Sequence, residues 1–333
     1  MDDVLIRFKK EVGELGAHID FLEEIQNQIL NTSSLYVYVQ SREKRQIDYK
    51  SLIISIYGLV ENYVAQLVKS YLTNIRSEVP DYSYLKDRIK ESHFAKSIVL
   101  ASAIQQGKFN KFNHLNKEDV IHNLNGCITN QPDCVINYDA FVMQTGNLTH
   151  NKICELFRLL DIDLISMLKK SDIFSASATS ANVFNTLDDL VDRRNEVAHG
   201  AEFDLLGLTE LRPILNFVDV YFDEVYKVVS SDLAMEVREI RKSKCVEVNE
   251  LLGDKDNGQV VFELFSTKLV GFYNAPPNSL VVGKAFIVQR SDGTLEDVIV
   301  EEVQVHEGIG VSVKLNKSIT RNNKIFLEKD VFI

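Results

Sequence analysis

The stretch SLIISIYGLVENYVAQLVKSYL, residues 51–72, constrains the fold more than any other part of the chain. Its apolar residues occupy most of the circumference of a helix, whereas a surface helix carries a single apolar stripe. A helix from about Glu43 to Ile75 is therefore expected to lie buried at the centre of a helical unit. Pro80 closes that region because proline cannot continue a helix.

The remainder of the chain predicts more helices and then strands. Helical spacing of apolar residues recurs over 3–30, 83–125, 151–169 and 208–240, while 126–150 is turn-rich, with a short strand or an irregular loop, and 171–182 is a polar loop. After Cys245 the apolar segments become short, rich in β-branched and aromatic residues, and separated by Gly, Asn, Asp and Pro. The pattern predicts an α+β two-domain protein: a helical domain over 1–240 and a small β-barrel or sandwich over 245–333.

Charge and hydropathy narrow the function classes. The formal net charge of −11 should repel nucleic acid and anionic membranes at long range. That counts against a non-specific polyanion binder but leaves room for a local basic site. No apolar run approaches 18 residues, so no membrane span is expected. The N-terminus lacks the basic-then-apolar order of a signal peptide, and we therefore expect a cytoplasmic protein.

The four cysteines contain no C-x-x-C pair and predict no disulfide framework. A zinc site has to be considered, because five potential ligands fall within a short stretch: His122, Cys127, Cys134, His150 and Cys154. Zinc sites usually show tighter spacing of paired cysteines. Buried reduced thiols are the preferred interpretation, and we expect neither a metal nor a cofactor.

The segment DDLVDRRNEVAHG, residues 188–200, places polar residues on a helix that is otherwise suited to burial. Arg194 falls on the apolar stripe formed by Leu187, Leu190, Val191, Val197 and Ala198. A charge there is costly unless a function requires it. Asn195 and His199 are one turn apart, whereas Arg194 lies about 140° around the helix from His199 and roughly 7.5 Å along it.

The chemistry of this trio suits phosphate. Histidine titrates near neutrality and can accept or donate a proton. Arginine offers a planar, permanently charged fork that matches a phosphate and can hold charge developing on a pentacoordinate phosphorus. Asn195 is expected to fix the histidine tautomer or to contact phosphate through its amide.

The string R-N-E-V-A-H-G resembles the motif of HEPN-domain ribonucleases, and most closely the R-N-x-x-A-H-G type of the RiboL-PSP-HEPN group. The resemblance extends to IYGLVENYV and to GNLTHNKICELFRLLDID, and covers about residues 45–225. It implies an antiparallel helical bundle that dimerises through the motif-bearing helices. It also implies metal-independent RNA cleavage by the 2′-hydroxyl, typical of a toxin or antiviral defence effector.

The resemblance also implies roles for individual residues. His199 would be the acid/base and Arg194 the phosphate stabiliser, with Asn195 beside them. Glu61 interrupts an apolar helix where the family often has an acidic residue, and would orient Arg194 or His199. The alternative is that Glu61 is a solvated residue at the helix edge.

A basic path for RNA is predicted over residues 83–117. This segment contains seven Lys and Arg residues and two Asp and Glu residues, a net charge of +5, and aromatic residues are interleaved among them. The residues we expect to contact RNA, with tRNA one candidate, are Lys96, Lys108, Lys111 and Arg193. The alternative is a solvated helix face whose aromatic residues lie in the core.

Two other functions stay open. The chain is alternatively a non-catalytic HEPN-type dimeric module that binds nucleotide or protein, with the β-domain as a recognition or regulatory module. A zinc-dependent activity around the cysteines is the weaker alternative. An antitoxin or a trigger protein would be a further partner in a toxin or defence system.

Overall fold

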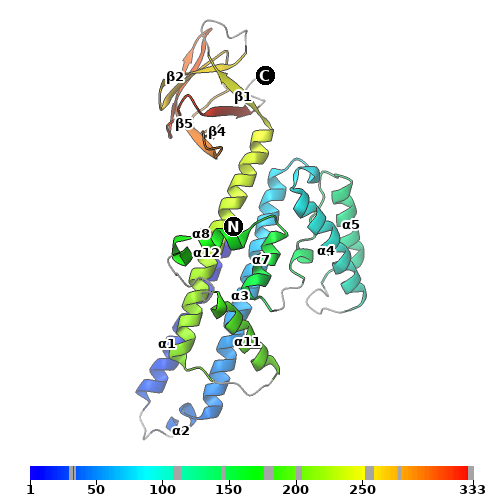
Figure 1. The fold of residues 1–333 in the computed structure, drawn as a ribbon, viewed down its shortest axis with the longest axis vertical. Helices are drawn as coiled ribbons and strands as arrows, with labels where there is room; N and C mark the ends of the chain where they lie inside the picture. Colours follow the sequence, from blue (N-terminus) through cyan, green and yellow to red (C-terminus); the bar gives the residue numbers. More distant parts are fainter. Residues whose placement is uncertain are drawn as a thin grey trace. The chain divides into compact units, whose positions relative to one another are not determined.

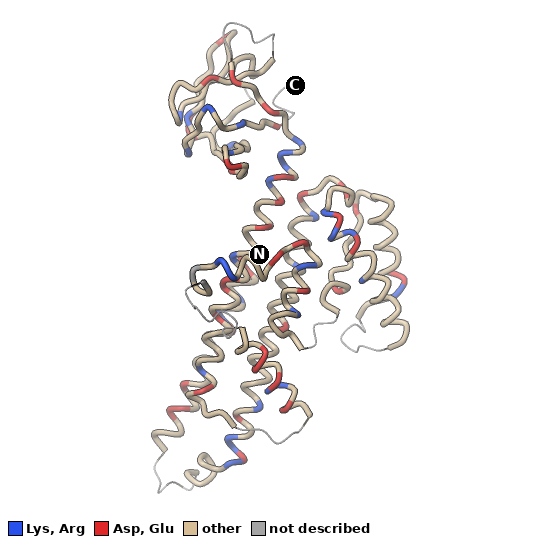
Figure 2. Tube along the Cα trace, viewed as in Figure 1, with Lys and Arg blue, Asp and Glu red and all other residues tan. Residues whose placement is uncertain are grey.

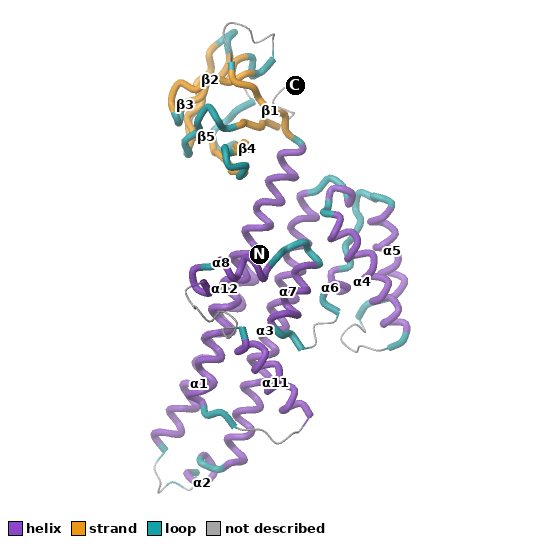
Figure 3. The backbone as a smooth tube through the Cα atoms, viewed as in Figure 1, coloured by secondary structure: helices purple, strands orange, loops and turns teal. Residues whose placement is uncertain are grey.

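The computed structural model describes residues 1–333 except 30–32, 34, 108–113, 144–146, 176–183, 200–204, 252–258, 277–278 and 329–333. The chain forms two compact units, Met1–Asp232 and Leu233–Ile333. Helices make up the first unit and the first residues of the second, and strands make up the rest of the second (Figure 3). The α+β two-domain expectation is therefore confirmed. The division falls inside the last long helix rather than after it.

The described helices follow one another along the first unit (Figure 1). They are α1 (Asp2–Gln28), α2 (Tyr36–Val39), α3 (Arg42–Glu78), the 3-10 helix η1 (Tyr82–Tyr84), α4 (Asp87–Gln105), α5 (Lys117–Ile128), α6 (Tyr138–Phe141), α7 (His150–Arg158), α8 (Leu164–Lys170), α9 (Asp172–Ser175), α11 (Asn185–His199) and α12 (Leu208–Ser243). The turn-rich region after α5 contains the single turn α6, and no strand is found among its described residues.

Helix α3 is the buried centre that the sequence predicts. Ser41 caps its first turn by accepting a hydrogen bond from the Lys44 N–H, and apolar side chains from Leu52 to Ile75 are buried on several sides. Among the described helices, α3 alone is long and apolar enough to cross a membrane, and more than half of its most apolar window is buried inside the protein.

The three long helices meet in an aromatic cluster. The ring of Tyr63 on α3 lies 4.2 Å from that of Phe8 on α1 and 5.3 Å from that of Phe222 on α12, measured between centroids. The Tyr71 hydroxyl adds a second link, because it donates to Asp232 on α12 at 2.7 Å. Such aromatic pairs contribute about 0.5–1.5 kcal/mol each beyond the area they bury.

The second unit is a closed seven-stranded barrel rather than a sandwich, in the order β1-β2-β3-β6-β5-β4-β7. Its strands are β1 (Cys245–Glu250), β2 (Val261–Ser266), β3 (Leu269–Tyr273), β4 (Ala285–Gln289), β5 (Leu295–His306), β6 (Gly310–Leu315) and β7 (Lys324–Glu328). Among the described strands, β1 and β2 are the only parallel pair. The last turns of α12 belong to this unit because Arg238 and Arg241 both bond to Asp297.

A buried histidine joins η1 and α4 to the segment before α6. The Nε2 atom of His93 accepts a hydrogen bond from the Asn137 N–H at 3.0 Å, so the proton of the neutral ring is on Nδ1. Nδ1 then donates to the Tyr82 hydroxyl at 2.9 Å. Burial lowers the pKa of His93 to about 4. A second proton would go to Nε2, where it would point at the Asn137 N–H, which is itself a donor.

This network predicts a pH dependence of stability. The unfolded chain takes up a proton at His93 near pH 6.5, whereas the folded chain does so only near pH 4. The contribution of His93 is therefore complete above pH 6.5 and is lost as the pH falls to 4, by about 3 kcal/mol in all. Urea denaturation between pH 7 and pH 4 measures it, and His93→Gln should show a shallower decline. Equal pH dependence in both proteins would contradict the assignment.

Candidate functional site

Helix α11 carries the motif and packs against α3, beside its N-terminal half (Figure 1). Its apolar stripe is buried as expected at Leu187, Leu190, Val191 and Val197. Ala198 is exposed, so its place in the stripe was predicted wrongly. The buried stripe ends at Val197 because the helix itself ends two residues later.

Arg194 is accommodated on that stripe by an aromatic ring. Its guanidinium carbon lies 4.2 Å from the centroid of the Tyr57 ring on α3, and its Nη1 donates to Asn195 Oδ1 at 2.8 Å. A cation over an aromatic face gains about 0.5–2 kcal/mol, depending on how far it is desolvated. Among the described residues, Arg194 has no ion pair. Its charge is held in place without being neutralised.

Tyr57 fixes this arrangement from the α3 side. It is only 3% exposed, and its hydroxyl accepts a hydrogen bond from the Leu148 N–H at 3.2 Å. One side chain therefore connects α3, α11 and the segment that leads into α7. Tyr57 was not among the predicted site residues, although it lies one turn before Glu61 in the segment IYGLVENYV.

His199 is the last residue of α11, and its side chain is exposed. Arg194, five residues earlier, is half-buried against α3. Since five helical residues turn through about 140°, the two side chains leave α11 on different sides. Within one chain the helix brings Arg194, Asn195 and Tyr57 together and leaves His199 at the helix end.

The other predicted site residues on these two helices are Glu61 on α3 and Arg193 on α11. Glu61 is half-buried on α3, one turn after Tyr57 and on the same side of that helix. Arg193 donates from Nε to Asp189 at 2.7 Å and from Nη1 to the Tyr49 hydroxyl at 3.3 Å. It thereby ties α11 to α3, a structural contact in addition to the predicted one with RNA.

The predicted basic path is only partly described. Lys96 is half-buried on α4, which packs chiefly against α5 and α6, and Lys108 and Lys111 lie outside the described residues. Acidic residues accompany the basic ones at the start of α4, where Asp87 and Glu91 lie (Figure 2). Ion pairs partly offset its positive charge, at Lys86–Asp232 and Lys90–Asp87.

The start of α11 is anchored by a second histidine. The Asp188 carboxylate accepts the backbone N–H of His150 at 2.9 Å, in the first turn of α7. The His150 ring is stacked on Phe184 at 3.9 Å between centroids and bonded through Nδ1 to the Tyr221 hydroxyl at 3.0 Å. Burial lowers the pKa of His150. The neutral, buried His150 therefore holds the start of α11 in position through Asp188.

The residues weighed as zinc ligands do not form a metal site in the described structure. Nowhere in that part of the chain do three His, Cys, Asp or Glu side chains gather closely enough to hold a metal ion. Cys127, Cys134 and Cys154 are buried and free. Burial raises the pKa of Cys127 and of Cys154 to about 12, so both are protonated thiols.

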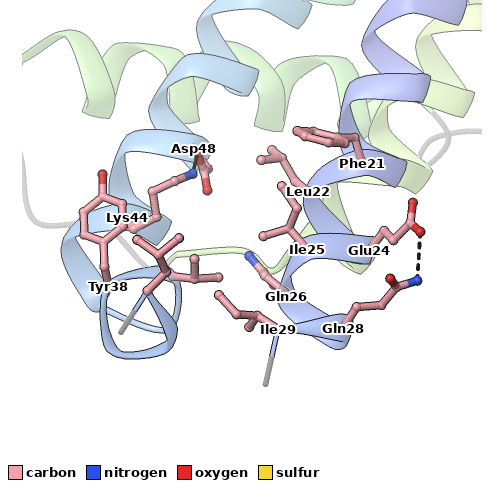
Figure 4. Close-up of a pocket in the computed structure, with 12 residues that line it drawn as sticks. Phe21, Leu22, Glu24, Ile25, Gln26, Gln28, Ile29, Tyr38, Lys44 and Asp48 are labelled. Carbon is pink, nitrogen blue, oxygen red and sulfur yellow. Dashed lines mark hydrogen bonds and ion pairs between the residues drawn. The ribbon is translucent and has the colours of Figure 1, made fainter. Parts of the chain in front are cut away.

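A large cavity lies away from Arg194, between α1, α2 and the start of α3 (Figure 4). Its volume is about 670 Å³, and its lining is mainly apolar, including Phe21, Leu22, Ile25 and Tyr38. Lys44 and Asp48 form an ion pair at its α3 wall. It contains none of the motif residues.

Two tyrosines on α3 test the role of the Tyr57 hydroxyl. Tyr57→Phe keeps the ring under Arg194 but leaves the buried Leu148 N–H without its acceptor, so we expect a loss of about 1–2 kcal/mol in unfolding free energy. Tyr63→Phe is the matched control, because the Tyr63 hydroxyl is buried without a partner among the described residues. It should be neutral or stabilising in urea denaturation. Equal effects of the two substitutions would contradict this account.

Comparison with known proteins agrees with the resemblance seen in the motif. The family model described as RiboL-PSP-HEPN matches residues 14–231, which include α3, α7, α11 and most of α12. The chain has no match among curated proteins and none among solved structures. The match spans most of the helical unit and stops before the barrel. The chain belongs to the RiboL-PSP-HEPN family, a group of HEPN domains.

Proposed function

We propose that this chain is a metal-independent RNA endonuclease that acts as a toxin or antiviral defence effector, with its site at the motif of α11. The observation that carries the proposal is the state of Arg194. It is half-buried on an apolar stripe, held on the Tyr57 ring, and without an ion pair among the described residues. A charge retained in that setting is suited to an anionic ligand.

The chemistry needs only groups that this chain supplies. The 2′-hydroxyl of the substrate attacks the neighbouring phosphorus while the His199 imidazole takes its proton. The imidazole then gives that proton to the 5′-oxygen as the bond between phosphorus and that oxygen breaks. The Arg194 guanidinium stabilises the charge on the phosphoryl oxygens as the pentacoordinate state forms. Asn195 accepts a hydrogen bond from Arg194 and so restricts its orientation. The products are a 2′,3′-cyclic phosphate and a free 5′-hydroxyl.

A second copy of the chain completes this site. Arg194 and His199 leave α11 about 140° apart, so within one chain they can face a common groove only at its edges. A two-fold axis beside α11 brings the Arg194 of one subunit toward the His199 of the other. The spacing of Arg194 and His199, together with the resemblance of the motif to that of HEPN ribonucleases, supports a homodimer through the motif-bearing helices.

RNA would approach along basic residues outside this pair. Lys96 and Arg193 are the described members of that path, and tRNA is the first substrate to test. The acidic remainder of the molecule would keep the enzyme off bulk nucleic acid in the cytoplasm. An antitoxin or trigger protein would then set when it cuts.

The test is cleavage of total cellular RNA and of a defined tRNA pool by the purified protein in EDTA, with the fragment ends mapped. Discrete cuts that leave cyclic phosphates are expected from the wild type and should be absent from His199→Ala. His122→Ala is the matched control, since His122 is also an exposed helical histidine, on α5. It should cut like the wild type.

Three results would oppose the proposal: cutting that survives His199→Ala, cutting that needs an added metal ion, or ends that carry no cyclic phosphate. Absence of cutting by every protein would leave two options: the non-catalytic binding module, or an enzyme that awaits a trigger at residues 245–333.

A further inference from the structure

The outer face of the barrel has a small aromatic cavity across β2, β3, β6 and the end of β5. Its volume is about 180 Å³, below the roughly 300–1,000 Å³ of sites for drug-sized ligands. Three of its lining residues have no bulky side chain: Gly271, Gly310 and Ser312. The rings of Phe265, Tyr273 and His306 also line it. The cavity therefore fits the end of one side chain.

Phe265 is held in place although its side chain is 52% exposed. It lies at the irregularity between Leu264 and Ser266, where β2 shifts register against β3. Its ring rests on Gly271, so closely that a Cβ on that residue would lie 2.7 Å from a ring carbon. Any residue other than glycine would displace the ring. An exposed aromatic ring that is fixed in this way is pre-organised for a ligand.

The other two rings are fixed by hydrogen bonds. The Tyr273 hydroxyl donates to the Glu263 carboxylate, and Glu263 lies opposite Gly271 in the β2–β3 pairing. His306 Nε2 is 2.9 Å from Ser312 Oγ, and Ser312 is 7% exposed. The Glu263 carboxylate is not itself part of the lining and lies next to it, bonded to the hydroxyl of Tyr273.

The charges around the cavity determine whether it favours a positively or a negatively charged ligand. Among the described residues that line it there is no lysine or arginine. Lys314, two residues beyond Ser312 on β6, is already paired with Glu302. Glu263 contributes a negative charge next to one of the lining rings, that of Tyr273. An RNA phosphate would be repelled here, whereas a cation would find aromatic faces and a carboxylate.

We propose that this face of the barrel binds an arginine side chain displayed by a protein partner. A guanidinium is planar and stacks on aromatic faces, while its N–H groups reach a carboxylate in the same plane. Phe265 and Tyr273 supply the aromatic faces, and the Glu263 carboxylate supplies the hydrogen-bond acceptor. The barrel is thereby assigned to recognition of a polypeptide, and this assignment does not depend on RNA cleavage at α11.

The absence of tryptophan from the chain makes a clean reporter possible. Phe265→Trp places a single tryptophan at the cavity of the full-length protein, and its fluorescence is titrated with acetyl-Gly-Arg-Gly-amide. We expect a saturable change with a Kd on the order of 1 mM, as suits one contact of this kind. The same peptide with citrulline has the shape of arginine without its charge and should bind at least tenfold more weakly.

Two further variants test whether binding depends on the charge of Glu263 and on the location of the tryptophan at the cavity. Glu263→Gln in the reporter background keeps an acceptor for Tyr273 but removes the charge, and should weaken the arginine peptide about fivefold. Phe94→Trp is the matched control, since Phe94 is 49% exposed on α4. It should show no saturable change. In the wild-type protein, saturation-transfer NMR should detect the arginine methylenes, and Phe265→Ala should abolish that signal.

Equal binding of the citrulline peptide, or no saturable change with arginine, would overturn the proposal. So would a fluorescence change in the Phe265→Trp protein that saturates at a lower concentration of a DNA oligonucleotide, which has no 2′-hydroxyl to cleave, because it would identify the cavity as a stacking site for bases.

Discussion

Helix α3 is apolar around most of its circumference, so other helices must pack on several of its sides to shield it from water. The helical unit is organised around that requirement. Aromatic rings from α1 and α12 meet α3 at Tyr63, while α11 packs beside its N-terminal half. The α11 contact includes a charge, because Arg194 lies over the ring of Tyr57. The same helix that forms the core therefore also positions the motif, so loss of packing at Tyr57 would alter both stability and the candidate site.

The sequence predicts what depends on local pattern. Helical periodicity identified α1, α3 and α12 to within a few residues, and short β-branched segments indicated a β-domain. Barrel closure was not predictable, since it requires β1 to pair with β7, far along the chain. Tyr57 was missed for the same reason, because its partners Leu148 and Arg194 are distant in sequence. Arg193 was predicted to contact RNA, and its link to Tyr49 appears only once α11 is packed on α3.

The two units have different surface chemistry. On α11 an arginine keeps its charge without an ion pair among the described residues, a setting that suits an anion. On the barrel, fixed aromatic rings stand beside a carboxylate, a setting that suits a cation. An enzyme with RNA at one unit and a protein partner at the other would combine catalysis with control. In such an arrangement a net charge of −11 restricts RNA binding to the local site.

Subunit mixing tests most directly whether one site takes Arg194 from one chain and His199 from the other. Arg194→Ala and His199→Ala proteins are each assayed on RNA in EDTA, alone and after unfolding and refolding together in equal amounts. Random pairing makes half of the dimers mixed, each with one intact site of two, so the account predicts recovery of about one quarter of wild-type activity. Activity no greater than that of the separate variants, in a mixture shown to contain mixed dimers, would contradict a shared site.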